Sequence, residues 1–181
     1  NEELAGSSSN DNLIAVADSN HPQSMDDALL GHRFVRVNVG RIDPVDLPAI
    51  VDIHVKRLDL DESLSNGTPA TEHARHLICE ALLAEEKPIC KAVQGTGKSL
   101  ELYAKDILVP RVIAFITSRA KRYSLSRKGN KKRVTEDDLR RAIREEMRHQ
   151  ASQVKPNNLH LFVDGLDPQD QARVSHVEPL L

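Results

Sequence analysis

The spacing of the apolar residues changes near position 68, and this change limits what the chain can fold into more than any other feature. Before it, valine and isoleucine alternate with polar residues over residues 35–39 and again over 51–55. Such alternation turns one side of an extended chain towards a core, so it predicts two half-buried strands that pair as a β-hairpin. After it, apolar residues recur every three or four positions. The sequence therefore predicts a mainly α-helical protein with a small N-terminal β-hairpin extension.

The first of three predicted helices has Thr68 as its N-cap residue and Pro69 at its first helical position, where a proline is favourable. It must end before Pro88, because a proline restricts the residue that precedes it. A basic, glycine-bearing loop then follows over residues 87–99. The apolar face of this helix consists of Ala74, Leu77, Ile78, Ala81 and Leu82.

The second predicted helix carries the longest apolar stripe of the chain. Pro110 lies inside it, and a proline within a helix removes a hydrogen bond, so it must kink or split the helix. A second basic loop follows over residues 124–132. The stripe consists of Leu100, Tyr103, Ala104, Ile107, Leu108, Val112, Phe115, Ile116, Ala120 and Tyr123.

The third predicted helix has the clearest start signal in the sequence. Thr135 and Asp138 resemble a capping box, in which each side chain bonds the other residue's backbone N–H, with aspartate in place of the usual Glu or Gln. Val134 and Leu139 flank this cap and can form a hydrophobic staple. The apolar edge of the helix consists of Leu139, Ile143 and Met147.

These elements divide the chain of 181 residues into four regions. We expect a flexible arm over residues 1–27, the hairpin-like extension over 28–67, the helical domain over 68–151, and a C-terminal tail or docking segment over 152–181. The apolar run near residues 159–167 is the candidate docking strand. Because the first residue is Asn1, we expect that sequence upstream of it is missing.

Composition excludes several classes of protein. No run approaches the roughly 20 apolar residues of a membrane helix, which excludes an integral membrane protein. Two cysteines cannot supply a disulfide framework or a zinc cage. Residues 1–90 carry seven basic and 16 acidic side chains, a balance of −9, whereas residues 91–181 carry 18 and 11, a balance of +7. This asymmetry indicates an anionic partner for the second half, a contact between the halves, or a bipolar surface without a ligand.

The order of helix, basic loop, long helix, basic loop and capped helix resembles the histone-fold family over residues 71–147. KAVQGTGKSLELYAKDIL is similar to the first loop and second-helix start of the branch that holds the A-type core histone and the gamma-type CCAAT-binding subunit. GNKKRVTEDDLRRAIREE is similar to that branch's second loop and capped third helix, and Glu145 and Glu146 fall where the A-type histone bears part of an acidic docking surface. The acidic, partly β N-terminal half favours a divergent subunit over a packaging histone.

The resemblance implies a histone-fold-like three-helix unit that pairs with another histone-fold chain, a heterodimer being favoured over a homodimer. It implies a non-enzymatic subunit of a larger nuclear chromatin assembly that binds duplex DNA, or RNA if the assembly is a different one, without cofactor or metal. The dimerisation residues would be Leu100, Tyr103, Ile107, Leu108, Val112, Phe115, Ile116, Leu139 and Ile143.

Basic side chains in the two loops are the predicted nucleic-acid contacts. Clustered cations bind phosphate oxygens, which gives affinity without reading sequence and weakens steeply with salt. The same cluster also fits a solvated loop or a nuclear-import patch. The predicted contact residues are Lys91, Lys98, Lys121, Arg122, Arg127, Lys128, Lys131, Lys132 and Arg133.

Two other functions stay open. The first is a structural subunit of a large complex with protein-only contacts, in an organelle after removal of a targeting segment. The second is a nucleotide-binding protein, because residues 92–99 fit a relaxed P-loop with alanine at its first position. Lys98 would then bind phosphates, while Ser99 and Asp164 would hold Mg²⁺. The segment before this loop is a poor strand, which counts against that function.

Other chemistry has weaker signals. His73 and His76 lie three apart on one predicted helix, but two histidines without further close ligands are more often surface residues. Cys79 reads as a small core residue. Cys90 lies near Lys87 and Lys91, which can lower a thiol pKa, but no paired base accompanies it.

Overall fold

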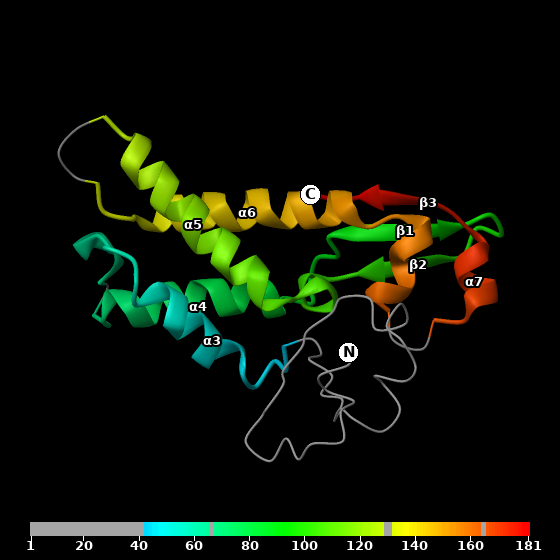
Figure 1. Cartoon of the computed structure of the whole chain (residues 1–181), viewed down its shortest axis with the longest axis horizontal. Helices are drawn as coiled ribbons and strands as arrows, with labels where there is room; N and C mark the ends of the chain where they lie inside the picture. The colour runs from blue at the N-terminus through cyan, green and yellow to red at the C-terminus, as the bar shows by residue number, and fades with distance from the viewer. Residues whose placement is uncertain (1–41, 66, 129–131, 164–165) are drawn as a thin grey trace, which may run out of the picture. The chain divides into compact units, whose positions relative to one another are not determined.

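The computed structural model describes residues 42–65, 67–128, 132–163 and 166–181. The predicted arm at 1–27 and the predicted strand at 35–39 lie outside these residues. Within them the protein is mainly helical with one small antiparallel sheet, which confirms the predicted fold class at this coarse level (Figure 1). The helices are α3 (Leu47–Val55), α4 (Ala70–Leu83), α5 (Pro110–Ser126), α6 (Glu136–Gln153) and α7 (Pro168–Ala172), with 3₁₀ turns η2 (Glu62–Leu64), η3 (Ala104–Ile107) and η4 (Pro156–Leu161).

The predicted strand at 51–55 is wrong, because these residues belong to helix α3. Pro48 stands in its first turn, where a proline is favourable. Leu47, Val51 and Val55 lie four residues apart on one side of the helix and are fully buried. Ile53 lies between them in sequence but on the opposite side. The apparent alternation therefore came from a helix that is apolar on two sides.

The predicted first helix is confirmed as α4, which ends well before Pro88. Ala74, Leu77, Ile78 and Leu82 are buried, as their spacing predicted. The predicted cap is wrong, since Pro69 rather than Thr68 is the N-cap residue and no side chain caps the helix.

The segment predicted as the first basic loop is a β-hairpin instead. Strands β1 (Cys90–Gln94) and β2 (Ser99–Leu102) are antiparallel, with Cys90 opposite Leu102. Between them, the N–H of Gly97 bonds the carbonyl of Gln94 at 2.9 Å and the N–H of Gln94 bonds the carbonyl of Lys98 at 2.8 Å. Gly97 has a φ of +83°, the left-handed conformation that ends a three-residue hairpin turn.

The C-terminal tail completes this sheet. Strand β3 (Val174–Pro179) pairs antiparallel with the other edge of β1, which gives the order β2-β1-β3. The docking strand is therefore downstream of the run near 159–167 that was predicted, and it docks on the chain's own sheet. In that run Leu159 is buried within η4, whereas Leu161 is exposed.

The predicted long helix is divided into three elements. Its first part forms β2 and η3, and only its second part forms α5. Pro110 occupies the first turn of α5, where its missing N–H needs no partner. The proline therefore begins a helix instead of kinking one.

The capped third helix is confirmed as α6, and both halves of the Thr135–Asp138 capping box are present. Val134 and Leu139 are buried on either side of the cap. Val134 also exchanges backbone hydrogen bonds with the α3–α4 connection, from its N–H to Asp59 at 2.7 Å and from Asp61 to its carbonyl at 2.9 Å. The start of α6 is thus held by its own capping box and by the α3–α4 connection.

The core is built mainly from Leu, Ile, Val and Ala side chains of α3, α4, α5 and α6, together with the inner face of the sheet. Figure 1 shows α3 beside α4, and α5 running from these helices towards the start of α6. In the described part of the chain, no helix is both long and apolar enough to cross a membrane.

Candidate functional site

The structure separates the basic residues that were predicted to bind nucleic acid. Lys91 is half-buried in β1 and Lys98 is exposed beside the hairpin turn. The remaining predicted contacts gather around the C-terminal end of α5, and Figure 1 shows this end on the opposite side of the molecule from the hairpin turn. Lys131 lies outside the described residues. One basic group therefore remains at the α5–α6 connection.

Two members of this basic group are bound to acids of the chain itself. Arg127 contacts the carboxylate of Asp138 and lies 3.3 Å from Thr135 Oγ1, so it supports the cap of α6. Arg133 pairs with Asp59 at 3.3 Å and with Glu62 at 3.0 Å. These two arginines stabilise the tertiary structure, because each connects the start of α6 to a neighbouring segment.

Burial and hydrogen bonding oppose each other at Asp138. Burial by itself would raise the pKa of this carboxyl, but hydrogen bonds from Arg127 and Thr135 to the charged form outweigh it. The pKa of Asp138 is therefore held below its ordinary value. The cap of α6 includes a carboxylate that stays ionised in the folded protein.

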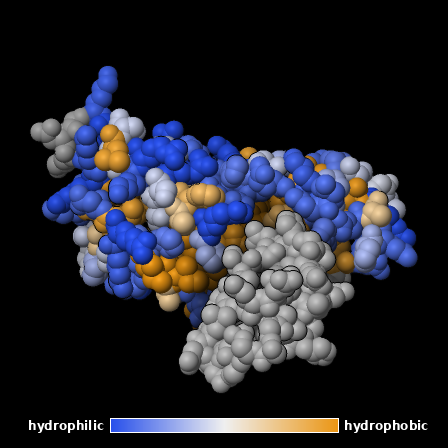
Figure 2. All heavy atoms as spheres, in the orientation of Figure 1, coloured by the Kyte–Doolittle hydropathy of each residue, from blue (hydrophilic) through white to orange (hydrophobic). Residues whose placement is uncertain are grey.

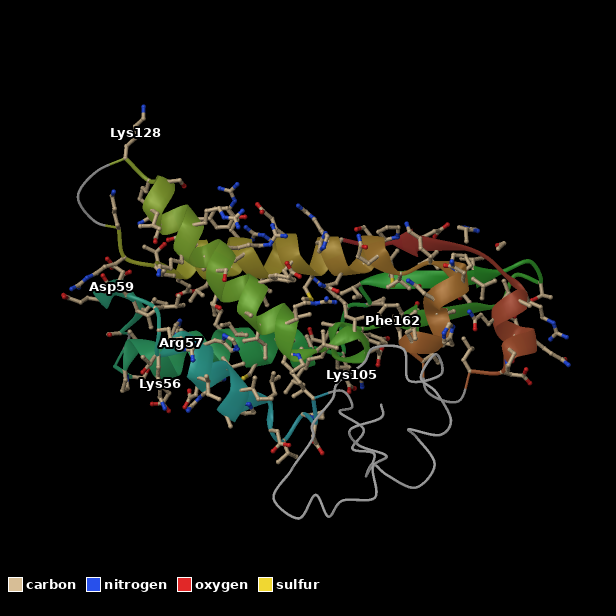
Figure 3. The ribbon with its side chains drawn as sticks, in the orientation of Figure 1. Lys56, Arg57, Asp59, Lys105, Lys128 and Phe162 are labelled. Atoms are coloured by element: carbon tan, nitrogen blue, oxygen red, sulfur yellow. The ribbon has the colours of Figure 1, made fainter. Side chains whose placement is uncertain are left out.

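Four further cations of the basic group are exposed: Lys121, Arg122, Lys128 and Lys132. Among the described residues none of them forms an ion pair with a side chain. Figure 3 shows Lys128 extending away from the helices at the start of the connection, just after α5. At the α5–α6 connection, these four side chains are the members of the predicted contact set whose charges are left for a partner, and the exposed Lys98 lies apart from them at the hairpin turn.

Most of the predicted dimerisation residues are buried inside the chain. Ile107, Leu108, Val112, Ile116, Leu139 and Ile143 all lie in its own core. Intramolecular packing thus accounts for their apolar character without a partner. Tyr103 is half-buried, and Leu100 and Phe115 are exposed at 38% and 42%.

The residues of the candidate P-loop do not form one. A P-loop requires a strand, a phosphate-binding turn and then a helix whose N-terminus faces the phosphates. Here Lys98 lies at the turn of an antiparallel hairpin, and Ser99 begins its second strand, β2. Leu159 and Leu161 belong to a 3₁₀ turn rather than to a strand, and Asp164 lies outside the described residues.

His73 and His76 do not converge on a metal site. His73 faces Glu136 across α4 and α6 at 3.1 Å, whereas His76 faces Glu80 along α4 at 3.7 Å. Within the described ranges, no three His, Cys, Asp or Glu side chains gather as metal ligands.

The two thiols have raised pKa values. Burial raises the pKa of Cys79 and raises that of Cys90 to about 11. The lysines beside Cys90 in sequence therefore do not make it a reactive thiolate, because the side chain points into the core.

Helix α6 contains a buried charge that the sequence prediction missed. Glu146 is fully buried and bonds Arg119 of α5 at 3.0 Å and Gln150 at 2.7 Å. The expected acidic docking surface is thus wrong for Glu146. Glu145 is engaged as well, since hydrogen bonds from Tyr123 and Arg141 hold its pKa below the usual range. The helical spacing could have predicted the burial of Glu146, because this residue falls on the apolar face that includes Ile143 and Met147.

The outer side of α3 is the second feature that the prediction missed. Val45 and Ile53 are 84% and 55% exposed, and with the exposed Ala49 between them they repeat every four residues. Backbone bonds from Leu47 to Asp43 (3.1 Å) and from Ile50 to Asp46 (3.2 Å) extend the helical path towards Val45. Figure 2 shows hydrophobic side chains over α3 on this face of the molecule. The four-residue spacing of Val45, Ala49 and Ile53 could have predicted this surface, whereas the two-residue alternation predicted a strand.

No protein-family profile and no curated protein sequence matches this chain.

Proposed function

We propose that this chain is a non-enzymatic protein-interaction module that contributes its helices to a larger assembly. The observation that carries the proposal is the apolar outer side of α3, formed by Val45, Ala49 and Ile53. A short helix that is apolar on both sides is typical of an element with packing partners on both sides. The core covers one side of α3, and a partner protein would cover the other.

The energetics support this assignment. Full burial of an aliphatic side chain contributes about 1.5–3 kcal/mol, so removing Val45 and Ile53 from water gives an appreciable part of a protein–protein contact. The contact expected from α3 is hydrophobic and only weakly dependent on salt.

A photo-crosslinker at position 53 of the full chain tests the proposal in the cells that make it. The matched control places the same group at Asp137, an exposed polar position on α6. We expect position 53 alone to crosslink to one defined polypeptide, a second copy included, and we expect Ile53→Glu to abolish binding of that purified polypeptide. Crosslinks from position 53 only within the same chain, or none, would overturn the proposal.

Duplex DNA binding is the second candidate, and the exposure of Lys121, Arg122, Lys128 and Lys132 favours it. Four phosphate contacts predict roughly a hundredfold loss of affinity between about 50 and 200 mM salt. Fluorescence anisotropy with a labelled duplex measures this loss for the wild type and for a variant with all four changed to glutamine. Equal, negligible binding by both proteins would remove this candidate.

Pairing with a second histone-fold chain is one form that such an assembly could take. The order of α4, α5 and α6 and the capped start of α6 support it. The β1–β2 hairpin between α4 and α5 and the burial of six predicted dimerisation residues count against it. Sedimentation velocity of the chain alone and with its crosslinked partner distinguishes a pair of chains from a larger assembly.

A further inference from the structure

A small apolar groove lies between α4, η3, α6 and the last residue of the chain. Its volume is about 220 Å³, and its apolar lining includes Ile89, Ile143 and Met147. Small-molecule sites commonly enclose about 300–1,000 Å³, so this groove is small for a cofactor. A cavity of about 150 Å³ accommodates a benzene ring, so the groove has room for one large apolar side chain.

The polar side chains that line the groove are cationic. Lys87 follows α4 on one side, and Arg144 and Arg148 project from α6 on the other. All three are exposed, and in the part of the chain that the structure describes none of them forms an ion pair or a side-chain hydrogen bond. The nearby Glu85 contacts Lys105 instead. Positive charge therefore flanks the apolar floor on both sides.

The arginines of the groove differ from their neighbours on the same helix. Arg140 pairs with Glu136 at 2.6 Å and Arg141 pairs with Glu145 at 2.9 Å, each four residues away. Arg144 instead has Arg140 four residues before it and Arg148 four residues after it. Like charges at this spacing destabilise a helix. An anionic partner over Arg144 and Arg148 would relieve this repulsion.

We propose that this groove binds an acidic peptide segment of a partner protein, inserting one large apolar side chain between flanking Asp or Glu residues. The apolar side chain fills the floor, while the carboxylates bond Lys87, Arg144 and Arg148. Arginine favours this role, because its planar guanidinium bonds a carboxylate through two parallel N–H groups. This surface is separate from the outer side of α3, so the inference goes beyond the proposed function and does not depend on it.

Fluorescence anisotropy with a labelled synthetic peptide tests the inference on the full chain. The probe carries a leucine–phenylalanine pair between two pairs of glutamates. Two matched peptides replace either the apolar pair with serines or the glutamates with glutamines. We expect saturable binding of the first peptide only, and weaker binding at higher salt.

Two protein variants with the same loss of charge locate the site. We expect the double variant Arg144→Gln, Arg148→Gln to weaken binding about tenfold, because it removes two charge-assisted contacts. We expect Lys121→Gln, Arg122→Gln on α5 to change binding less than about twofold, because those cations lie outside the groove. All four positions are exposed, and circular dichroism with thermal melting confirms that both variants fold.

Three results would overturn the inference. They are no saturable binding of the apolar acidic peptide, equal binding of the serine peptide, and equal weakening by both double variants. The last two would reduce the effect to general attraction between opposite charges.

Discussion

Helices α3 and α6 each bury one side in the core, but their outward sides differ in chemistry. The outward side of α6 is charged and carries ion pairs between Glu136 and Arg140 and between Arg141 and Glu145. The outward side of α3 carries an ion pair, between Asp52 and Lys56 at 3.7 Å, and is otherwise apolar at Ala49, Ile53 and the preceding Val45. Helix α6 also has a complete capping box, whereas no side chain caps α3. The comparison indicates that α6 is suited to water and α3 to a second protein surface.

The largest expected effect separates the two sides of α3. Leu47→Ala should lower the free energy of unfolding by about 3 kcal/mol, because it leaves a cavity in a fully buried layer. Ile53→Ala on the opposite side should cost less than about 1 kcal/mol. Urea denaturation measures both. Similar losses for the two variants would mean that the outward side of α3 is packed within the chain.

The next effect concerns the buried charge of α6. Arg119→Ala should cost about 2 kcal/mol, because among the described residues it leaves the buried Glu146 carboxylate with Gln150 as its one side-chain partner. This value is below that of a fully buried pair, since the Arg119 side chain is 29% exposed. Arg122→Ala, one turn further along α5, is the control and should change stability by less than about 0.5 kcal/mol. A loss as small as that of the control would make the Arg119–Glu146 pair dispensable.

A smaller effect compares the two helix starts. Thr135→Ala should lower stability by about 1 kcal/mol, because it removes the side-chain acceptor for the Asp138 N–H. Asp46→Ala at the start of α3 should cost only a few tenths of a kcal/mol, because its side chain makes no cap hydrogen bond. Thermal melting of the two variants measures the difference. Equal costs would contradict the contrast between the capped and uncapped helices.

The smallest expected effect is the acid sensitivity of the α6 cap. The folded pKa of Asp138 lies below its ordinary value of 3.8, so the ionised form stabilises the fold above that value. This contribution is lost as the pH falls through the lowered folded pKa. Asp138→Asn should therefore lose less stability than the wild type between neutral pH and pH values below the ordinary aspartate pKa. Parallel losses in urea titrations at the two pH values would assign the acid sensitivity to other groups.

The sequence predicted correctly those elements that depend on interactions between residues close together in the chain. Helices α4 and α6 were predictable, because apolar spacing and the Thr135–Asp138 cap act within a few residues. The α3 prediction failed because a two-residue and a four-residue spacing share the same valines at 51 and 55. The nine-residue helix is too short for its local propensity to decide between them.

The candidate surfaces were less predictable than the helices. The basic residues near the α5–α6 connection were found from sequence, but the acids that bind Arg127 and Arg133 were not. Asp59 and Glu62 lie about seventy positions before Arg133, and no local pattern links them. Sequence composition therefore overstated the number of cations available to a partner.

By itself, the sequence determined a mainly helical chain with a core of aliphatic side chains and a firmly capped third helix. Only the tertiary structure decided that residues 90–102 form a hairpin, since Cys90 pairs with Leu102 on one edge and with Pro179 on the other. It also decided which charges stay free, burying Glu146 against Arg119 while leaving Arg144 and Arg148 beside an apolar groove. Strand pairs and ion pairs join residues far apart in sequence, and their formation depends on the packing that brings those residues together.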